Sequence, residues 1–197
     1  LPGSWRNRRC TMTPGDKTPN RYGAKSRISA AVLALIVAGA GAPEIYRQVL
    51  LEKEGSRTAA YLDGAGIWTI CMGLTRIYGR QVAKGDKLSP QECARLDAEE
   101  QARGLLEMES LVKPNVWATL SPASRAGLAS WCVHNIGASK CRTSTALREL
   151  NAGRRNEACA AITLWIKDGG KDCRIRAHGC SGQVERRQLE DELCLHS

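Results

Sequence analysis

The chain has 197 residues, 43 % of them hydrophobic and 25 % charged, which suits one domain with a substantial core and leaves no room for a second independent domain. Its formal net charge is +9, but residues 1–27 contain seven Lys or Arg side chains and one acidic side chain. The rest of the chain therefore carries an excess of only +3, and this composition argues against a nucleic-acid-binding protein.

Residues 1–27 combine Pro, Gly, Ser and basic residues with almost no large apolar side chain, so we expect this leader to be disordered. Residues 28–42 follow without a charged side chain. As a helix they would measure ~22 Å, against roughly 30 Å for the hydrocarbon core of a bilayer. A basic leader before a short apolar run is typical of an export signal or a weakly held membrane anchor. The small residues Ala38-Gly39-Ala40 match a cleavage site, so a cleaved signal and an uncleaved anchor both stay open.

Residues 43–197 predict one α+β domain, with a single small strand region followed by helices. Pro43 suits a first helical turn and Gly55 a helix end, which predicts a helix from Pro43 to about Glu54. Residues 61–71 predict a β-hairpin that turns at Asp63-Gly64.

Five further helices are expected after the hairpin. The capping box Ser89-Pro90-Gln91-Glu92 opens the first of them. Ser121-Pro122 opens the second, which we expect to run through Trp131. The last three are expected from near residue 144 to 151, from 157 to 166 and from 184 to 195.

Eight of the nine cysteines follow the apolar segment, which indicates an oxidising compartment. Eight cysteines allow 105 pairings, and sequence alone does not choose among them. The short loops favour two disulfides first, and two others then follow by elimination: Cys132–Cys141 and Cys173–Cys180, then Cys71–Cys93 and Cys159–Cys194. The cysteine spacings are unlike those of zinc sites, so we expect no metal and no cofactor. The three histidines form no ligand pair and are expected to be ordinary surface or core residues: His134, His178 and His196.

Two carboxylates come from adjoining but different local structures, Glu54 from the end of a helix and Asp63 from a hairpin turn. Glycosidases need such a pair on the two sides of the scissile bond. Because the last turn of a helix is the negative end of its dipole, we expect the pKa of Glu54 to be raised, as suits a general acid. Asp63 is expected to stay ionised as a base, and the hydroxyl of Thr69 to position a water molecule. Each residue also has a purely structural explanation, as a solvated helix residue, a turn former or a strand residue.

The pattern E-x8-D-x5-T formed by Glu54, Asp63 and Thr69 resembles the phage-type lysozymes, the muramidase endolysins of glycoside hydrolase family 24. The resemblance runs from about Pro43 to the C-terminus. Other residues also fall where that family has similar ones: Arg57, Tyr61 and Gly73. Segments 135–137, 142–145 and 172–176 look like those of cysteine-rich prophage endolysins.

The resemblance implies a disulfide-stabilised lysozyme-like fold, with a small N-terminal lobe that carries the hairpin and a larger helical C-terminal lobe. In that family the glutamate is the general acid, the aspartate is the base or electrostatic stabiliser, and the threonine holds the attacking water, which gives inversion. Peptidoglycan would lie between the lobes. Three loop residues are candidates for substrate contacts and equally for structural roles: Asn135, Gly137 and Arg142. Leu74 departs from the family, since many members have a histidine after the glycine.

Residues 28–42 look like the signal-arrest-release segments of some endolysins, which insert uncleaved and leave the bilayer when the membrane is depolarised. Because this segment contains no cysteine, the resemblance favours the version in which the freed helix refolds against the catalytic domain. It further implies export to the bacterial periplasm, tethering at the inner membrane before release, a monomer, and a holin partner by family analogy.

The carboxylate pair and the resemblance together predict an enzyme that hydrolyses the β-1,4 bond between N-acetylmuramic acid and N-acetylglucosamine, for host cell lysis. A lytic transglycosylase is the enzymatic alternative, and it would use Glu54 without needing Asp63 and Thr69. A wall-binding module without catalytic activity is the alternative that is not an enzyme.

Overall fold

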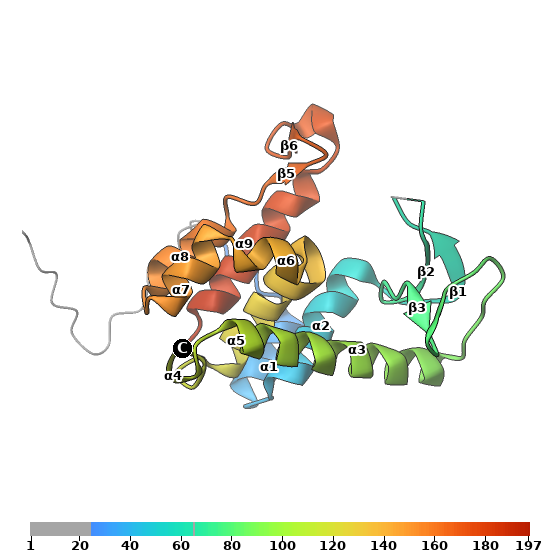
Figure 1. The fold of residues 1–197 in the computed structure, drawn as a ribbon, viewed down its shortest axis with the longest axis horizontal. Helices are drawn as coiled ribbons and strands as arrows, with labels where there is room; N and C mark the ends of the chain where they lie inside the picture. The colour runs from blue at the N-terminus through green and yellow to red at the C-terminus, as the bar shows by residue number, and fades with distance from the viewer. Residues whose placement is uncertain (1–24, 65) are drawn as a thin grey trace, which may run out of the picture.

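The computed structural model describes residues 25–64 and 66–197. In this part of the chain, the long helix α3 (Pro90–Leu111) runs from a small lobe of short strands into a larger lobe of packed helices (Figure 1). The small lobe contains two antiparallel pairs, β1 (Arg57–Leu62) with β2 (Trp68–Cys71) and β3 (Arg76–Ile77) with β4 (Arg80–Gln81). The predicted α+β class and two-lobed lysozyme-like arrangement are therefore confirmed.

Helix α2 leads from the helical lobe into the small lobe, and the remaining helices and a third strand pair complete the larger lobe. Their bounds are α1 (Ala30–Val37), α2 (Ala42–Glu54), α4 (Pro114–Trp117), α5 (Pro122–Ala129), the π-helical η1 (Ser130–Ile136), α6 (Ala138–Arg142), α7 (Thr145–Asn151), α8 (Arg155–Ile162), β5 (Lys167–Asp168), β6 (Lys171–Asp172), the 3₁₀ turn η2 (Arg176–His178) and α9 (Ser181–Leu195).

Local signals in the sequence give the correct ends of several elements. The side chain of Ser89 accepts a hydrogen bond from the Glu92 amide while the Glu92 carboxylate accepts one from the Ser89 amide, so the predicted capping box is confirmed. Gly55 ends α2 with φ +67°, a left-handed conformation that favours glycine. The predicted hairpin is also confirmed, with Leu62 paired to Trp68 beside its turn.

Three elements differ from the sequence expectation. The helix opened by Pro122 changes to π-helical geometry at Ser130 and continues to Ile136. The helix expected over 157–166 ends at Ile162, because the following amides bond to carbonyls three residues back. A second strand region, β5 with β6, was not expected, since its strands have two residues each and show no alternating pattern.

All four predicted disulfides are confirmed: Cys71–Cys93, Cys132–Cys141, Cys159–Cys194 and Cys173–Cys180. The first joins β2 to α3 in the small lobe, and the third joins α8 to α9 in the helical lobe. Each of these two disulfides joins a short element to a longer one. All four stabilise the fold chiefly by restricting the unfolded chain.

The apolar segment 28–42 forms α1 and the turn before α2. Val32 is fully buried in the main core, whereas Val37 is 79 % exposed. The N-terminal end of α1 is held by polar contacts, because Glu192 of α9 accepts hydrogen bonds from the Ser26 hydroxyl and the Arg27 amide. Most of the expected leader, residues 1–24, lies outside the described residues. Among the residues described, no helix is long and apolar enough to cross a membrane.

Gly127 of α5 lies directly against the backbone of α9. A Cβ placed there would lie 2.7 Å from the Leu193 Cβ and 3.2 Å from the Glu190 carbonyl oxygen. Only a residue without a side chain fits between these two backbones. The position of α9 therefore depends on this glycine.

We predict that Gly127→Ala lowers the free energy of unfolding by about 1–3 kcal/mol, because overpacking must push α5 and α9 apart. Gly182→Ala is the matched control on α9, since a Cβ there meets nothing within 4 Å. This control is expected to be neutral or to stabilise by up to about 1 kcal/mol. Urea denaturation measures both values, and equal stability of the two variants would contradict the prediction.

Candidate active site

Glu54 is the last residue of α2 and lies where the helical lobe joins the small lobe. Gly55 ends the helix directly after it, and β1 begins at Arg57. The Glu54 side chain is 30 % exposed, so solvent and ligands reach it. The sequence thus places this carboxylate at the junction of the two lobes by ending a helix there.

Two groups from distant parts of the chain contact the Glu54 carboxylate. The Arg186 Nη1 atom of α9 donates a hydrogen bond of 2.5 Å to Oε1, and the His134 Nε2 atom of η1 lies 3.3 Å from the same oxygen. Three separate elements, α2, η1 and α9, therefore meet at Glu54.

The sequence predicted a raised pKa for Glu54, and this prediction is wrong. The hydrogen bond with His134, together with the hydrogen bond and charge of Arg186, outweighs burial and lowers the pKa of Glu54 to about 2. The helix dipole on which the expectation rested contributes only about 0.3–1 kcal/mol. The two contacts from His134 and Arg186 stabilise the ionised form more than the helix dipole destabilises it. Glu54 is therefore a carboxylate when no substrate is bound.

Arg186 is fixed from behind by a buried carboxylate. Glu190, fully buried and one turn along α9, accepts from the Arg186 Nε atom at 3.4 Å and from the Ser130 hydroxyl at 2.8 Å. Arg187 adds an ion pair of 3.1 Å to the other Glu190 oxygen. Burial raises the pKa of Glu190, while both arginines and Ser130 oppose this shift. The Arg186 guanidinium is therefore held between one buried and one accessible carboxylate.

His134 projects from η1 toward the meeting point of the lobes. Its Cε1 atom lies 4.0 Å from where a Cβ on Gly73 would be, and Gly73 has φ +97° in the turn after β2. The disulfide Cys132–Cys141 fixes η1 to α6 directly beside it. The expectation that His134 is an ordinary histidine is wrong, since its ring contacts the Glu54 carboxylate.

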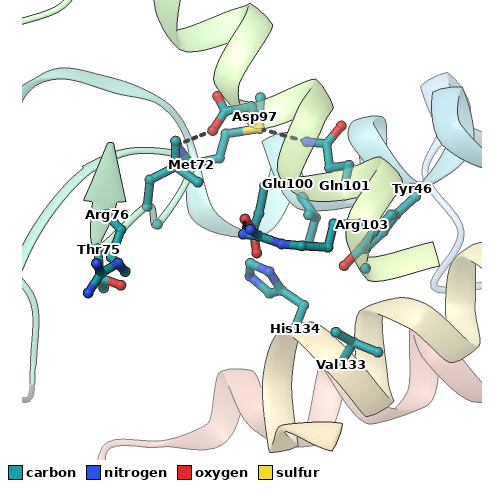
Figure 2. Close-up of a pocket in the computed structure, with 14 residues that line it drawn as sticks. Tyr46, Met72, Thr75, Arg76, Asp97, Glu100, Gln101, Arg103, Val133 and His134 are labelled. Atoms are coloured by element: carbon teal, nitrogen blue, oxygen red, sulfur yellow. Dashed lines mark hydrogen bonds and ion pairs between the residues drawn. The ribbon is translucent and has the colours of Figure 1, made fainter. Parts of the chain in front are cut away.

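A cavity of about 250 Å³ opens beside His134, between α2, α3, η1 and the turn after β2. Figure 2 shows the His134 ring directed into this cavity, with Asp97, Glu100 and Arg103 reaching it from α3. Asp97 is 1 % exposed; its Oδ1 accepts from the Met72 amide, and its Oδ2 has no hydrogen-bond partner among the described residues. Burial raises the pKa of Asp97.

Leu74, the residue that departs from the family pattern, lines the same cavity. An apolar side chain there offers no hydrogen bond to a buried carboxylate such as Asp97. The departure thus affects the packing between α3 and the small lobe rather than the contacts of Glu54.

Asp63 and Thr69 both belong to the β1–β2 hairpin. Asp63 follows β1, where its Oδ1 accepts a hydrogen bond of 2.8 Å from the Ile67 amide. Thr69 lies in β2, is 3 % exposed, and donates from Oγ1 to the Ile67 carbonyl at 3.1 Å. The loop that ends at Ile67 therefore fixes both side chains on the same hairpin, whose first strand begins three residues after Glu54.

The three candidate substrate contacts lie around the end of η1 and the following helix α6. Asn135 belongs to η1, Gly137 connects the two helices with φ +82°, and Arg142 is exposed at the end of α6. None of the three lines the cavity beside His134. Across residues 25–64 and 66–197, no group of three or more His, Cys, Asp or Glu side chains is placed to hold a metal ion.

Comparison with known proteins places this geometry in a family. The phage lysozyme family model matches residues 51–190, which include Glu54, Asp63, Thr69, His134 and Arg186. This chain belongs to the phage lysozyme family. The SAR-endolysin of Escherichia phage 933W is 54 % identical over 173 residues, covering 88 % of this chain and 93 % of that protein.

A probable prophage lysozyme of Escherichia coli strain K12 is 51 % identical, covering 89 % of this chain and 95 % of that protein. Among solved structures, a mutant of P22 lysozyme matches with a TM-score of 0.62 and 31 % identity, covering 77 % of this chain and 95 % of that one. The family membership and the fold make this chain a glycoside hydrolase of the lysozyme type.

Two residues of the site, His134 and Arg186, were missed by sequence reasoning. They lie 80 and 132 residues from Glu54, so no local pattern connects them to it. Arg186 does stand four residues before Glu190, a spacing that places an ion pair on one helix face. That signal indicates a structural pair and does not reveal that the pair reaches Glu54.

We predict that Glu54→Gln lowers the free energy of unfolding at neutral pH. The folded-state pKa of about 2 lies below the ordinary value of 4.5, so the carboxylate stabilises the folded state fully above about pH 4.5. This contribution is lost as the pH falls from 4.5 toward 2. Thermal unfolding midpoints of wild type and variant should therefore converge on acidification.

Glu109→Gln is the matched control, because Glu109 is an exposed carboxylate near the end of α3. Its difference from wild type should stay nearly constant between pH 7 and pH 3. A gap for Glu54→Gln that widens toward acidic pH would contradict the prediction.

Proposed function

We propose that this chain is an endolysin that hydrolyses the β-1,4 bond between N-acetylmuramic acid and N-acetylglucosamine in peptidoglycan. The single observation that carries this proposal is the Glu54 carboxylate, which is accessible at the junction of the lobes and fixed by Arg186 and His134. The matching phage lysozyme model and the relatives that are endolysins support the same activity.

In the proposed mechanism Glu54 is the general acid. Its pKa of about 2 leaves Glu54 ionised in the empty site, so the mechanism requires it to gain a proton when the sugar binds. Displacement of water by the sugar favours this step, because desolvation opposes ionisation. Glu54 then transfers this proton to the glycosidic oxygen as the bond to the anomeric carbon breaks. The leaving sugar thereby gains a hydroxyl group.

Asp63 and Thr69 complete the reaction on the other side of the sugar. A water molecule held by Thr69 attacks the anomeric carbon and gives its proton to Asp63, which inverts the configuration. The Thr69 hydroxyl hydrogen already bonds to the Ile67 carbonyl, so its oxygen is left to accept from that water. Asn135, Gly137 and Arg142 remain proposed contacts to the glycan.

We predict that Glu54→Gln abolishes the loss of turbidity of purified peptidoglycan, and that Asp63→Asn lowers the rate by at least about 100-fold. Wild-type products should carry reducing ends without anhydro-muropeptides. Glu109→Gln, exposed on α3, is the control and should keep the wild-type rate. Anhydro products would favour a lytic transglycosylase, and wall binding without turbidity loss would favour a non-catalytic module.

The proposed route to the wall is export with residues 28–42 uncleaved, followed by release from the inner membrane into the periplasm. In the structure this segment forms α1, which packs against α2 and buries Val32 in the main core. That arrangement fits a released segment that has refolded onto the domain. A monomeric enzyme and a holin that permits release belong to the same proposal.

We predict that collapse of the membrane potential moves the full-length protein from the membrane fraction to the soluble fraction without shortening. Fractionation and immunoblotting before and after treatment with an uncoupler measure this. A soluble product shortened by the length of the leader and the apolar segment would show that the segment is a cleaved signal.

A further inference from the structure

The two groups that contact Glu54 share one of its oxygens. Arg186 Nη1 and His134 Nε2 both lie against Oε1, at 2.5 and 3.3 Å. Neither of them forms a hydrogen bond with Oε2. This asymmetry anchors one oxygen and leaves the other to carry the proton that a general acid delivers.

The two groups differ in how their charge responds to pH. The guanidinium of Arg186 keeps its charge throughout the working range of an enzyme. An imidazole changes charge near neutral pH. In its neutral form, with hydrogen on Nε2, His134 donates to Oε1 while Oε2 carries a proton. In its cationic form it adds a second positive charge beside Arg186, which favours the ionised carboxylate.

We propose that His134 is a positioning residue that leaves Glu54 available as an acid when the imidazole is neutral and holds it as a carboxylate when the imidazole is protonated. The inference rests on the proposed role of Glu54 in hydrolysis. It predicts that protonation of His134, a residue outside the family's acid, base and threonine set, lowers the activity on the acidic side of the pH profile.

Titratable and charged groups face His134 from the elements packed against it. Glu54 and Tyr46 face it from α2, and Arg186 reaches the same carboxylate from α9. The others line the cavity beside its ring: Asp97, Glu100 and Arg103 from α3, and Arg76 from β3. Glu100 and Arg103 pair with each other. Burial raises the pKa of Tyr46, so this phenol stays neutral.

His134→Gln tests the proposal, because glutamine keeps an N–H donor and cannot change charge. The ratio of variant to wild-type rates on purified peptidoglycan is compared at pH 8 and pH 5. Taking this ratio cancels the effects of pH on the substrate. We expect this ratio to be at least about tenfold higher at pH 5 than at pH 8, since each pH unit below an imidazole's titration reduces its neutral form tenfold. A purely structural role for His134 would give the same ratio at both pH values.

His178→Gln is the matched control, because His178 bonds to the Asp172 carbonyl in the β6–η2 region and has no contact with Glu54. Its ratio should stay near one at both pH values. His134→Asn is a second non-titrating amide and should show the same rise from a lower absolute rate, which keeps the test valid if the glutamine variant folds poorly. Circular dichroism establishes that each variant is folded.

The outcomes separate this inference from the proposed function. A flat ratio for both His134 variants, with Glu54→Gln inactive, overturns the role of His134 and leaves hydrolysis by Glu54 intact. Full activity of Glu54→Gln overturns the site itself. A rise with acidification in both His134 variants, absent from His178→Gln, supports the inference.

Discussion

The ion pair between Arg186 and Glu54 connects the last helix of the chain to the end of α2, and the site depends on it. Arg186 is only 11 % exposed, and its guanidinium is held from behind by the fully buried Glu190. The location of Glu190 depends in turn on how closely α9 lies against α5, where Gly127 leaves no room for a side chain. The position of the Arg186 guanidinium against the Glu54 carboxylate therefore depends on backbone packing deep in the helical lobe.

A comparison of magnitudes explains why Glu54 is ionised in the empty site. The C-terminal end of a helix disfavours a carboxylate by about 0.3–1 kcal/mol. Hydrogen bonds to a charged group each contribute about 1.5–3 kcal/mol, and Glu54 has two neighbours able to donate. The helix end thus determines where Glu54 lies, whereas η1 and α9 determine its charge. In the proposed mechanism, Glu54 therefore depends on substrate binding to exclude water and restore its proton.

The sequence predicted what short-range chemistry decides. The capping box of α3, the glycine after α2, the Asp63-Gly64 turn and the disulfides of the two short loops each follow from residues close together in the chain, and all appear in the structure. The other two disulfides, Cys71–Cys93 and Cys159–Cys194, followed by elimination and are also present. Glu54 was found for the same reason, since it combines a helix end with a recognisable spacing to the hairpin. The lowered pKa of Glu54 was not predicted, because the two residues that lower it lie 80 and 132 residues away in the chain.

The π-helical geometry of η1 was also not predicted from the sequence. A helix with π-helical hydrogen bonding differs from an α-helix only in how its backbone is wound, and Ser130–Ile136 carries no proline or glycine to mark the change. Yet the winding decides which side chains face the junction of the lobes. His134 reaches Glu54 because of this turn, so the composition of the segment alone does not reveal its role.

Helix α1 contacts the two helices that supply Glu54 and Arg186. The Ser29 hydroxyl donates to Glu52 on the last turn of α2, and Ser26 and Arg27 bond to Glu192 of α9. In the proposed tethered state Ser26 and Arg27 lie on the cytoplasmic side of the membrane and Ser29 lies at the cytoplasmic end of the membrane segment, so none of them can reach either carboxylate. These contacts and the burial of Val32 then form only after release. Since Glu52 and Glu54 end the same helix, docking of α1 restrains the end of α2 at Glu54. Under the proposed release route, this contact couples departure from the membrane to the order of the proposed active site.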